Sequence, residues 1–93
     1  MGRRKKIKDA ISLRAQEDAH KKLAEDPDVD VGEHTREYWR KESFRYHQQL
    51  EEIIEKAQLP RTYIREIEQK GKQEGEKLYR KRKQKLKNQK ERK

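Results

Sequence analysis

The sequence contains no cysteine, and its 93 residues include only two prolines, four glycines and six aromatic side chains. Without cysteine, the chain has no disulfide framework, no thiolate metal site and no thiol chemistry. Hydrophobic residues make up 28% of the chain, and no run of them approaches the ~18 residues that a transmembrane helix needs. No signal-peptide hydrophobic segment follows Met1, so we expect a soluble intracellular protein without membrane association.

Charge is abundant and unevenly placed: 48% of the residues are charged, and the formal net charge is +9. Residues 1–8 carry five basic groups and no acid, and residues 80–93 carry nine basic groups and one acid. The residues between them hold 13 basic and 17 acidic groups. The pattern predicts a basic N-terminal arm (1–8), a helical body (9–79) and a basic C-terminal tail (80–93). A chain this polar buries little surface, so we expect disordered basic ends and a partner that supplies part of the core.

Helical periodicity without strand alternation predicts an all-α fold of two to three helices, over about residues 5–25, 36–58 and 62–86. The first is expected to stop at Asp26-Pro27, and the second before Pro60. Two N-caps are possible for the second helix: Asp30, which has Glu33 at the spacing of a capping box, and Thr35. Thr35 is favoured because Val31 and Gly32 are poor residues for a first turn, and Thr62 is the predicted N-cap of the third helix. We expect a helical hairpin or an open, extended arrangement.

One helix face carries most of the large apolar side chains, and we expect the rest of the chain to be organised around it. This face, called the seam below, consists of Trp39, Tyr46, Leu50, Ile53, Ile54 and Ala57. Its heptad-like spacing is typical of a helix that packs against another helix as in a coiled coil, so we predict a partner interface there. Ser43 fills a gap in the seam, Phe44 is expected to widen it, and Tyr38 falls outside it.

Gly71 and Gly75 lie four residues apart in the third predicted helix. They form either a notch that lets another backbone approach closely or a point where the helix frays or kinks.

The basic ends are candidate contacts for phosphates, because lysine and arginine displace condensed counterions from a nucleic-acid backbone. The candidate residues are Arg3, Arg4, Lys5, Lys6, Lys8, Arg80, Lys81, Arg82, Lys83, Lys85 and Lys87. The alternative interpretation is a solubilising tail or a nuclear-localisation signal, for which the run Arg80–Lys83 is suited.

No pattern points to catalysis or to a metal. Glu17 and His20 have the spacing of half a di-iron motif, but a second such motif and further inward carboxylates are missing from the sequence. There is no glycine-rich phosphate loop, nucleophile elbow or zinc-ligand spacing. We therefore expect a protein that is not an enzyme and uses no cofactor or metal.

These observations favour an accessory protein of a ribonucleoprotein, such as a ribosome or an RNA-processing assembly. Its ends would bind RNA phosphates, and its central helix would pack on a protein neighbour. In a eukaryote the expected location is the nucleus or the ribosome-associated cytoplasm. The alternative is a coiled-coil adaptor or homo-oligomer whose basic ends only target or solubilise it. Binding to DNA is not excluded, although no helix-turn-helix spacing with a recognition helix is present.

Overall fold

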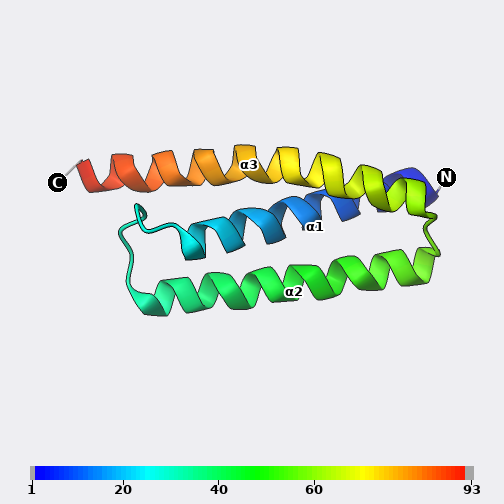
Figure 1. The fold of residues 1–93 in the computed structure, drawn as a ribbon, viewed down its shortest axis with the longest axis horizontal. Helices are drawn as coiled ribbons and strands as arrows, with labels where there is room; N and C mark the ends of the chain where they lie inside the picture. The colour runs from blue at the N-terminus through cyan, green and yellow to red at the C-terminus, as the bar shows by residue number, and fades with distance from the viewer. Residues whose placement is uncertain (1, 92–93) are drawn as a thin grey trace.

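A computed structural model describes the backbone of residues 2–91 and the side chains of residues 4–89. It confirms the all-α fold, with helices α1 (Gly2–Glu25), α2 (Glu33–Ala57) and α3 (Arg61–Glu91) and no strand in the described part of the chain. The fold is elongated, with extents of 49 × 21 × 18 Å. α1 and α3 run in the same direction along the long axis, and α2 runs the opposite way (Figure 1).

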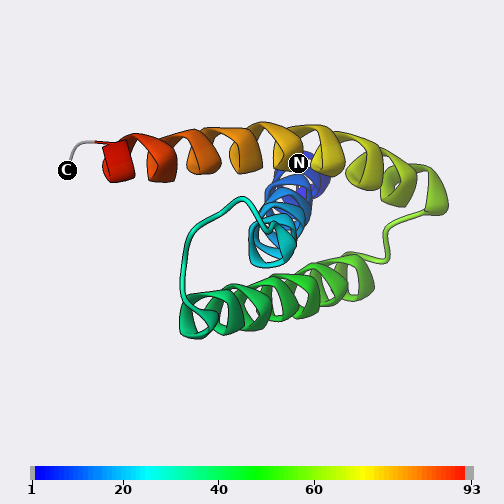
Figure 2. The same ribbon diagram turned by 60° about the vertical axis from the view of Figure 1, so that its left-hand side comes forward.

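The central element of the fold is α1. It packs against both α2 and α3, whereas α2 and α3 make little direct contact with each other. Figure 2 shows α1 lying between the two longer helices, which meet only at the corner that joins them. The prediction that the seam-bearing helix organises the chain was therefore wrong, because the helix with the smallest apolar side chains is the one that both others contact.

Small side chains allow α1 to lie between two helices. Its buried positions include Ala10, Ala15, Ala19 and Ala24. On α3, Gly71 and Gly75 face α1, and a β-carbon added at Gly71 would lie 2.4 Å from Cγ of Arg14. Of the two interpretations of the glycine pair, the notch is therefore the one observed, and the helix that enters it is the chain's own α1.

Two apolar clusters hold the three helices together, one near each end of α1. The buried members of the first, next to the corner between α2 and α3, are Ala10, Leu50, Leu59 and Ile67. The buried members of the second, near the linker after α1, are Leu23, Ala24, Val29 and Trp39. Ile7 packs against the first cluster, and Tyr79 and Leu86 pack against the second. The packed part of the fold therefore starts inside the N-terminal basic segment and ends inside the C-terminal one.

The two basic ends, which we expected to be disordered, are helical in the structure. Residues 2–8 form the first turns of α1, and residues 80–91 form the last turns of α3. Packing explains the difference, since Ile7 and Leu86 attach these turns to the two clusters. In addition, the Lys83 ammonium lies 2.9 Å from the Asp26 carboxylate in the linker. Each end thus gains contacts that a count of its charges alone does not reveal.

α2 begins three residues earlier than predicted, with Gly32 and not Thr35 as its N-cap. The backbone N–H of Arg36 donates to the Gly32 carbonyl at 3.2 Å. The guanidinium of Arg36 reaches back to the carbonyls of Ala24 and Asp26 at 3.0 and 2.9 Å. Arg36 therefore fastens the first turn of α2 to the end of α1, and this contact sets where α2 starts.

The corner between α2 and α3 is built on Gln58 and Pro60. Gln58 has the left-handed conformation (φ 48°, ψ 52°), and the N–H of Leu59 donates to the carbonyl of Ile54 at 3.2 Å, as in a Schellman motif. The Pro60 carbonyl accepts the N–H groups of Tyr63 and Ile64, both at 3.1 Å. The prediction that Thr62 caps α3 was therefore wrong, since α3 begins at Arg61 and Pro60 occupies the capping position.

Candidate nucleic-acid interface

The candidate phosphate-binding residues fall into two groups at opposite ends of the molecule. Because α1 and α3 run in the same direction, the first turns of α1 and the last turns of α3 are separated along the 49 Å axis (Figure 1). The structure does not bring the two basic segments together into one patch. A ligand that contacts both basic segments must extend along the long axis of the molecule.

At the N-terminal end, Arg4, Lys5, Lys6 and Lys8 are exposed on α1 and form no ion pair with any described side chain. We call these four residues the N-terminal cluster. Arg3 was also predicted to bind phosphates, and its side chain lies outside the described residues. Successive residues of an α-helix are about 100° apart, so the cluster presents cations around much of the circumference of α1.

At the C-terminal end, the basic segment of α3 has two faces with different roles. The inner face contains Tyr79, Lys83 and Leu86, which contact the linker and the second apolar cluster. The outer face exposes Lys81, Lys85 and Lys87, none of which has an ion-pair partner among the described side chains. We call these three lysines the C-terminal cluster. Only part of the predicted basic tail is therefore free to bind a ligand.

An ion pair with the linker between α1 and α2 holds Lys83 against the body of the protein. Its ammonium lies 2.9 Å from Oδ2 of Asp26, whose side chain is 8% exposed. The Tyr79 hydroxyl donates a hydrogen bond to the same carboxylate, and the N–H of Asp28 donates to Oδ1 at 2.9 Å. The hydrogen bond from Tyr79, followed by those from Lys83 and Asp28, lowers the pKa of Asp26 to about 2. The same contact with Asp26 raises the pKa of Lys83. Lys83, which was predicted to contact phosphate, thus forms an ion pair that attaches α3 to the linker.

Arg80 and Arg82 also have partners within the chain. The Arg80 guanidinium donates to Glu76 on the same helix at 2.9 Å. A guanidinium nitrogen of Arg82 lies 3.4 Å from Nε2 of His20 on α1. His20 Nδ1 lies 2.7 Å from the Gln16 carbonyl, so Nδ1 donates there and Nε2 accepts from Arg82. Burial, aided by the charge of Arg82, lowers the pKa of His20. This arrangement favours the neutral imidazole.

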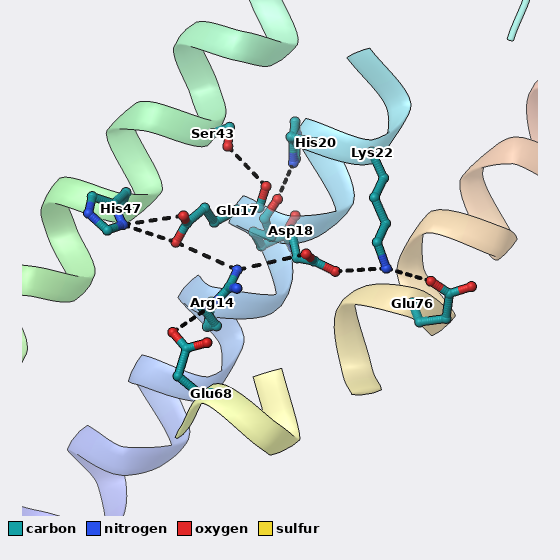
Figure 3. Close-up of polar contacts among 10 residues, drawn as sticks. Arg14, Glu17, Asp18, His20, Lys22, Ser43, His47, Glu68 and Glu76 are labelled. Carbon is teal, nitrogen blue, oxygen red and sulfur yellow. Dashed lines mark hydrogen bonds and ion pairs between the residues drawn. The ribbon is translucent and has the colours of Figure 1, made fainter. Parts of the chain in front are cut away.

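A polar layer occupies the middle of the molecule, between the two apolar clusters (Figure 3). Arg14 lies 3.0 Å from Glu68 on α3, and Lys22 lies 2.6 Å from Glu76 on α3 and 3.1 Å from Asp18. The close contact with Lys22 lowers the pKa of Glu76. The cations of α1 in this layer therefore link α1 to α3 and are not available at the surface as phosphate ligands.

The same layer connects α1 with α2. His47 contacts Glu17 at 3.2 Å and Glu51 at 3.0 Å. The Ser43 hydroxyl donates to the Glu17 carbonyl at 3.0 Å. Glu17 and His20, the half motif noted in the sequence, face different partners. Among the described residues, no group of three or more His, Cys, Asp or Glu side chains is arranged to hold a metal ion.

The seam, predicted to be a partner interface, packs within the chain. Trp39 and Leu50 are buried, and Tyr46 stacks at a tilt on His20 of α1, with ring centroids 5.3 Å apart. The other members, Ile53, Ile54 and Ala57, are partly buried against the first apolar cluster. The neighbour that we expected a partner to supply at this face is therefore α1 of the same chain.

Two large apolar side chains of α2 remain outside the core. Phe44 is 63% exposed, and Tyr38 is 57% exposed. Tyr38 was expected to lie outside the seam. The prediction that Phe44 widens the seam was wrong. The side chains of α1 beside Phe44 are Glu17, Lys21 and Glu25, which are charged and give it no apolar cover.

Sequence reasoning missed the contacts that tie the basic segments to the core. The linker contains Asp26, Asp28 and Asp30, but nothing in its own sequence identifies which cations these acids contact. The usable signal was the spacing of Tyr79, Lys83 and Leu86, which recur every three to four residues on one face of α3. That spacing indicates a packed face inside a segment that otherwise resembles a solvated tail.

No family model, no curated protein and no solved structure matches this chain. Within the described residues, no helix is both long enough and apolar enough to cross a membrane.

Proposed function

We propose that this protein is a small accessory component of a ribonucleoprotein, and that it binds RNA phosphates through its two basic ends. The observation that carries the proposal is the position of the cations that have no ion-pair partner among the described side chains. They include the N-terminal and C-terminal clusters, and these stand at the two ends of a body that is acidic overall. In a eukaryote, such a role belongs to the nucleus or to the ribosome-associated cytoplasm.

The chemistry of this function is counterion release. Each lysine that replaces a condensed cation on the RNA backbone adds about 0.7 to 0.9 to the slope of log affinity against log salt concentration. The C-terminal cluster is carried by a helix that Asp26 and Leu86 hold against the body. Its lysines therefore approach the phosphates from an ordered element, which reduces the entropy lost on binding.

The test is the salt dependence of RNA binding, measured by fluorescence anisotropy with a labelled RNA hairpin. The variant K81Q/K85Q/K87Q removes the C-terminal cluster without touching the contacts of Lys83. The matched control K21Q/K41Q/K72Q removes three exposed lysines that have no ion-pair partner among the described side chains and lie in the body.

We expect the first variant to flatten the salt slope by about two to three and the control to change it far less. Equal slopes for the wild type and the first variant would contradict the proposed role of the C-terminal cluster. Absence of RNA binding by the wild-type protein at low salt would contradict the whole proposal.

A second candidate function, an adaptor that binds another protein, is favoured by the exposure of Tyr38 and Phe44 on α2. Exposed aromatic side chains are enriched at protein interfaces. The substitution F44A distinguishes the two functions, because it should abolish assembly by an adaptor and leave the salt slope of RNA binding unchanged.

A further inference from the structure

The two clusters are separated by a stretch of the molecule that carries no excess of positive charge. Residues 66–79 of α3 contain three lysines and four glutamates, and residues 9–26 contain three basic and five acidic groups. Many of these cations are already paired: Lys70 lies 2.7 Å from Glu66, and Lys22 lies 2.6 Å from Glu76. A polyanion that lies along the long axis of the molecule therefore contacts cations at both ends and lies near acidic groups between them.

The separation of the clusters follows from the helical geometry. From Lys6 to Asp26 is twenty residues, or about 30 Å of α-helix and linker at 1.5 Å per residue. Asp26 contacts Lys83 of α3 at 2.9 Å, and Lys81 and Lys85 lie within one turn of Lys83. The centres of the two clusters are thus about 30 Å apart along the long axis.

This separation is fixed by the fold. The polar layer links α1 to α3 through Arg14–Glu68 and Lys22–Glu76 (Figure 3). Gly71 and Gly75 bring the two helices into close contact, and Asp26 holds the end of α3. The clusters cannot approach each other without the loss of these contacts. A ligand with a similarly fixed spacing of phosphates can meet both clusters without being ordered by the protein.

We infer that the ligand of the two clusters is an RNA duplex stem of about eleven base pairs or more, bound at two points, one at each basic end. The inference rests on the proposed function and specifies the form of RNA that it requires. A separation of about 30 Å corresponds to about nine phosphates along one strand of B-form DNA at ~3.4 Å each, and to about eleven in A-form RNA, which rises less per base pair. Duplex RNA is recognised mainly through its shape and its backbone, which suits a protein whose free side chains at these ends are cations.

Two-point binding predicts a step in affinity with stem length. A stem of about six base pairs reaches one cluster at a time, whereas stems of about 12 and 18 base pairs reach both. When one cluster is bound, the second contact becomes intramolecular and gains from a high effective concentration. We expect affinity to rise at least tenfold between the stems of about six and 12 base pairs, and little beyond.

The experiment measures affinity and salt slope for hairpins with these three stem lengths and for a single strand as long as the longest stem. Four proteins are compared: the wild type, K5Q/K6Q/K8Q, K81Q/K85Q/K87Q and the control K21Q/K41Q/K72Q. The substituted side chains are exposed, and circular dichroism verifies that helix content is retained. The wild type and the control should show the step, with a slope about two to three steeper on long stems than on the shortest. Each cluster variant should lose the step and retain binding like that of the short stem.

The outcomes separate the inference from the function on which it rests. If the wild type binds all stems with the same salt slope and only a gradual increase in affinity, two-point binding is wrong and phosphate binding stands. Tighter binding to the single strand than to the long stem would also overturn the inference, in favour of unpaired RNA. If the wild type binds none of these RNAs at low salt, both the inference and the proposed function fail.

Discussion

Gly71 of α3 lies so close to Arg14 of α1 that a β-carbon at position 71 would stand 2.4 Å from Cγ and 2.6 Å from Cβ of the arginine. Gly75 has the same relation to Asp18, with Cβ of the aspartate at 2.9 Å and the Ala15 carbonyl at 3.1 Å. The close approach of α1 and α3 depends on these two missing side chains. Arg14, next to Gly71, also forms an ion pair with Glu68 of α3 at 3.0 Å.

Replacement of Gly71 by alanine tests this packing, because two effects of opposite sign compete. Alanine gains about 1 kcal/mol of helix propensity, but the overlap with Arg14 forces α1 and α3 apart. Overpacking of this kind costs about 1 to 3 kcal/mol. The net expectation is that G71A lowers the free energy of unfolding, by up to about 2 kcal/mol in urea denaturation.

Gly32 provides the control for that substitution. A β-carbon there has no neighbour within 4 Å, and its φ of −71° suits alanine. G32A should leave stability within about 0.5 kcal/mol of the wild type. A G71A protein more stable than the wild type would mean that the helices do not approach as described.

Asp26 should make the stability of the protein depend on acid pH. Its pKa is lowered from 3.8 to about 2 by Tyr79, Lys83 and the N–H of Asp28. Since the folded state holds the charged carboxylate, the stabilisation is present above pH 4 and is lost as the pH falls toward 2. The expected size is about 1 kcal/mol, because the Lys83 side of the ion pair is partly exposed to solvent.

The measurement compares D26N with the wild type by urea denaturation between pH 7 and pH 2. At pH 7 the variant should be less stable, and the difference should shrink as the pH falls below 4. A difference that stays constant down to pH 2 would show that the carboxylate charge of Asp26 is not what stabilises the linker.

Leu50 and Glu51 are neighbours in sequence but lie on opposite sides of the boundary between core and solvent. Leu50 is 4% exposed in the first apolar cluster, and Glu51 is exposed and contacts His47 at 3.0 Å. L50D should destabilise the fold by several kcal/mol, since it buries an unpaired carboxylate. E51K should cost about 0.5 kcal/mol through loss of a surface contact. Thermal unfolding followed by circular dichroism measures both, and similar melting temperatures for the two variants would contradict the position of the seam.

Gln58 offers a stabilising substitution at the corner. Its left-handed backbone costs a residue with a β-carbon about 1 kcal/mol, and glycine is free of that cost. We expect Q58G to raise the free energy of unfolding by about 0.5 to 1 kcal/mol, whereas Q58V should lower it. Loss of stability in Q58G would mean that the Gln58 side chain makes a contact more important than the relief of backbone strain.

The sequence was sufficient to predict three helices, because local signals mark the breaks between them. Pro27 and Pro60 mark the two breaks, and the spacing from Trp39 to Ala57 marks the packed face of α2. Caps were harder to place, since Gly32 and Pro60 act through their backbone, whereas the prediction relied on residues with capping side chains.

The arrangement of the helices depends on signals that periodicity does not carry. The packed stripe of α1 is made mainly of alanine, which contributes little to a hydrophobic pattern but permits close packing on both sides. This stripe packs next to a pair of glycines some sixty residues away. Neither the alanine spacing in α1 nor the glycine spacing in α3 indicates which helix it will pack against. The order of the C-terminal segment depends on the packing of Leu86 and on the carboxylate of Asp26, which belongs to a linker distant in sequence. Exposed cations could be predicted as a group, but not which of them are used by the fold.

The central claim, that the protein binds RNA through its ends, is tested most directly by size-exclusion chromatography of the protein as purified, with and without ribonuclease treatment. Absorbance at two wavelengths separates nucleic acid from protein in each peak. The account predicts an RNA-containing species that nuclease converts to a monomer of 11.4 kDa. A homodimer free of nucleic acid, unchanged by nuclease, would contradict it.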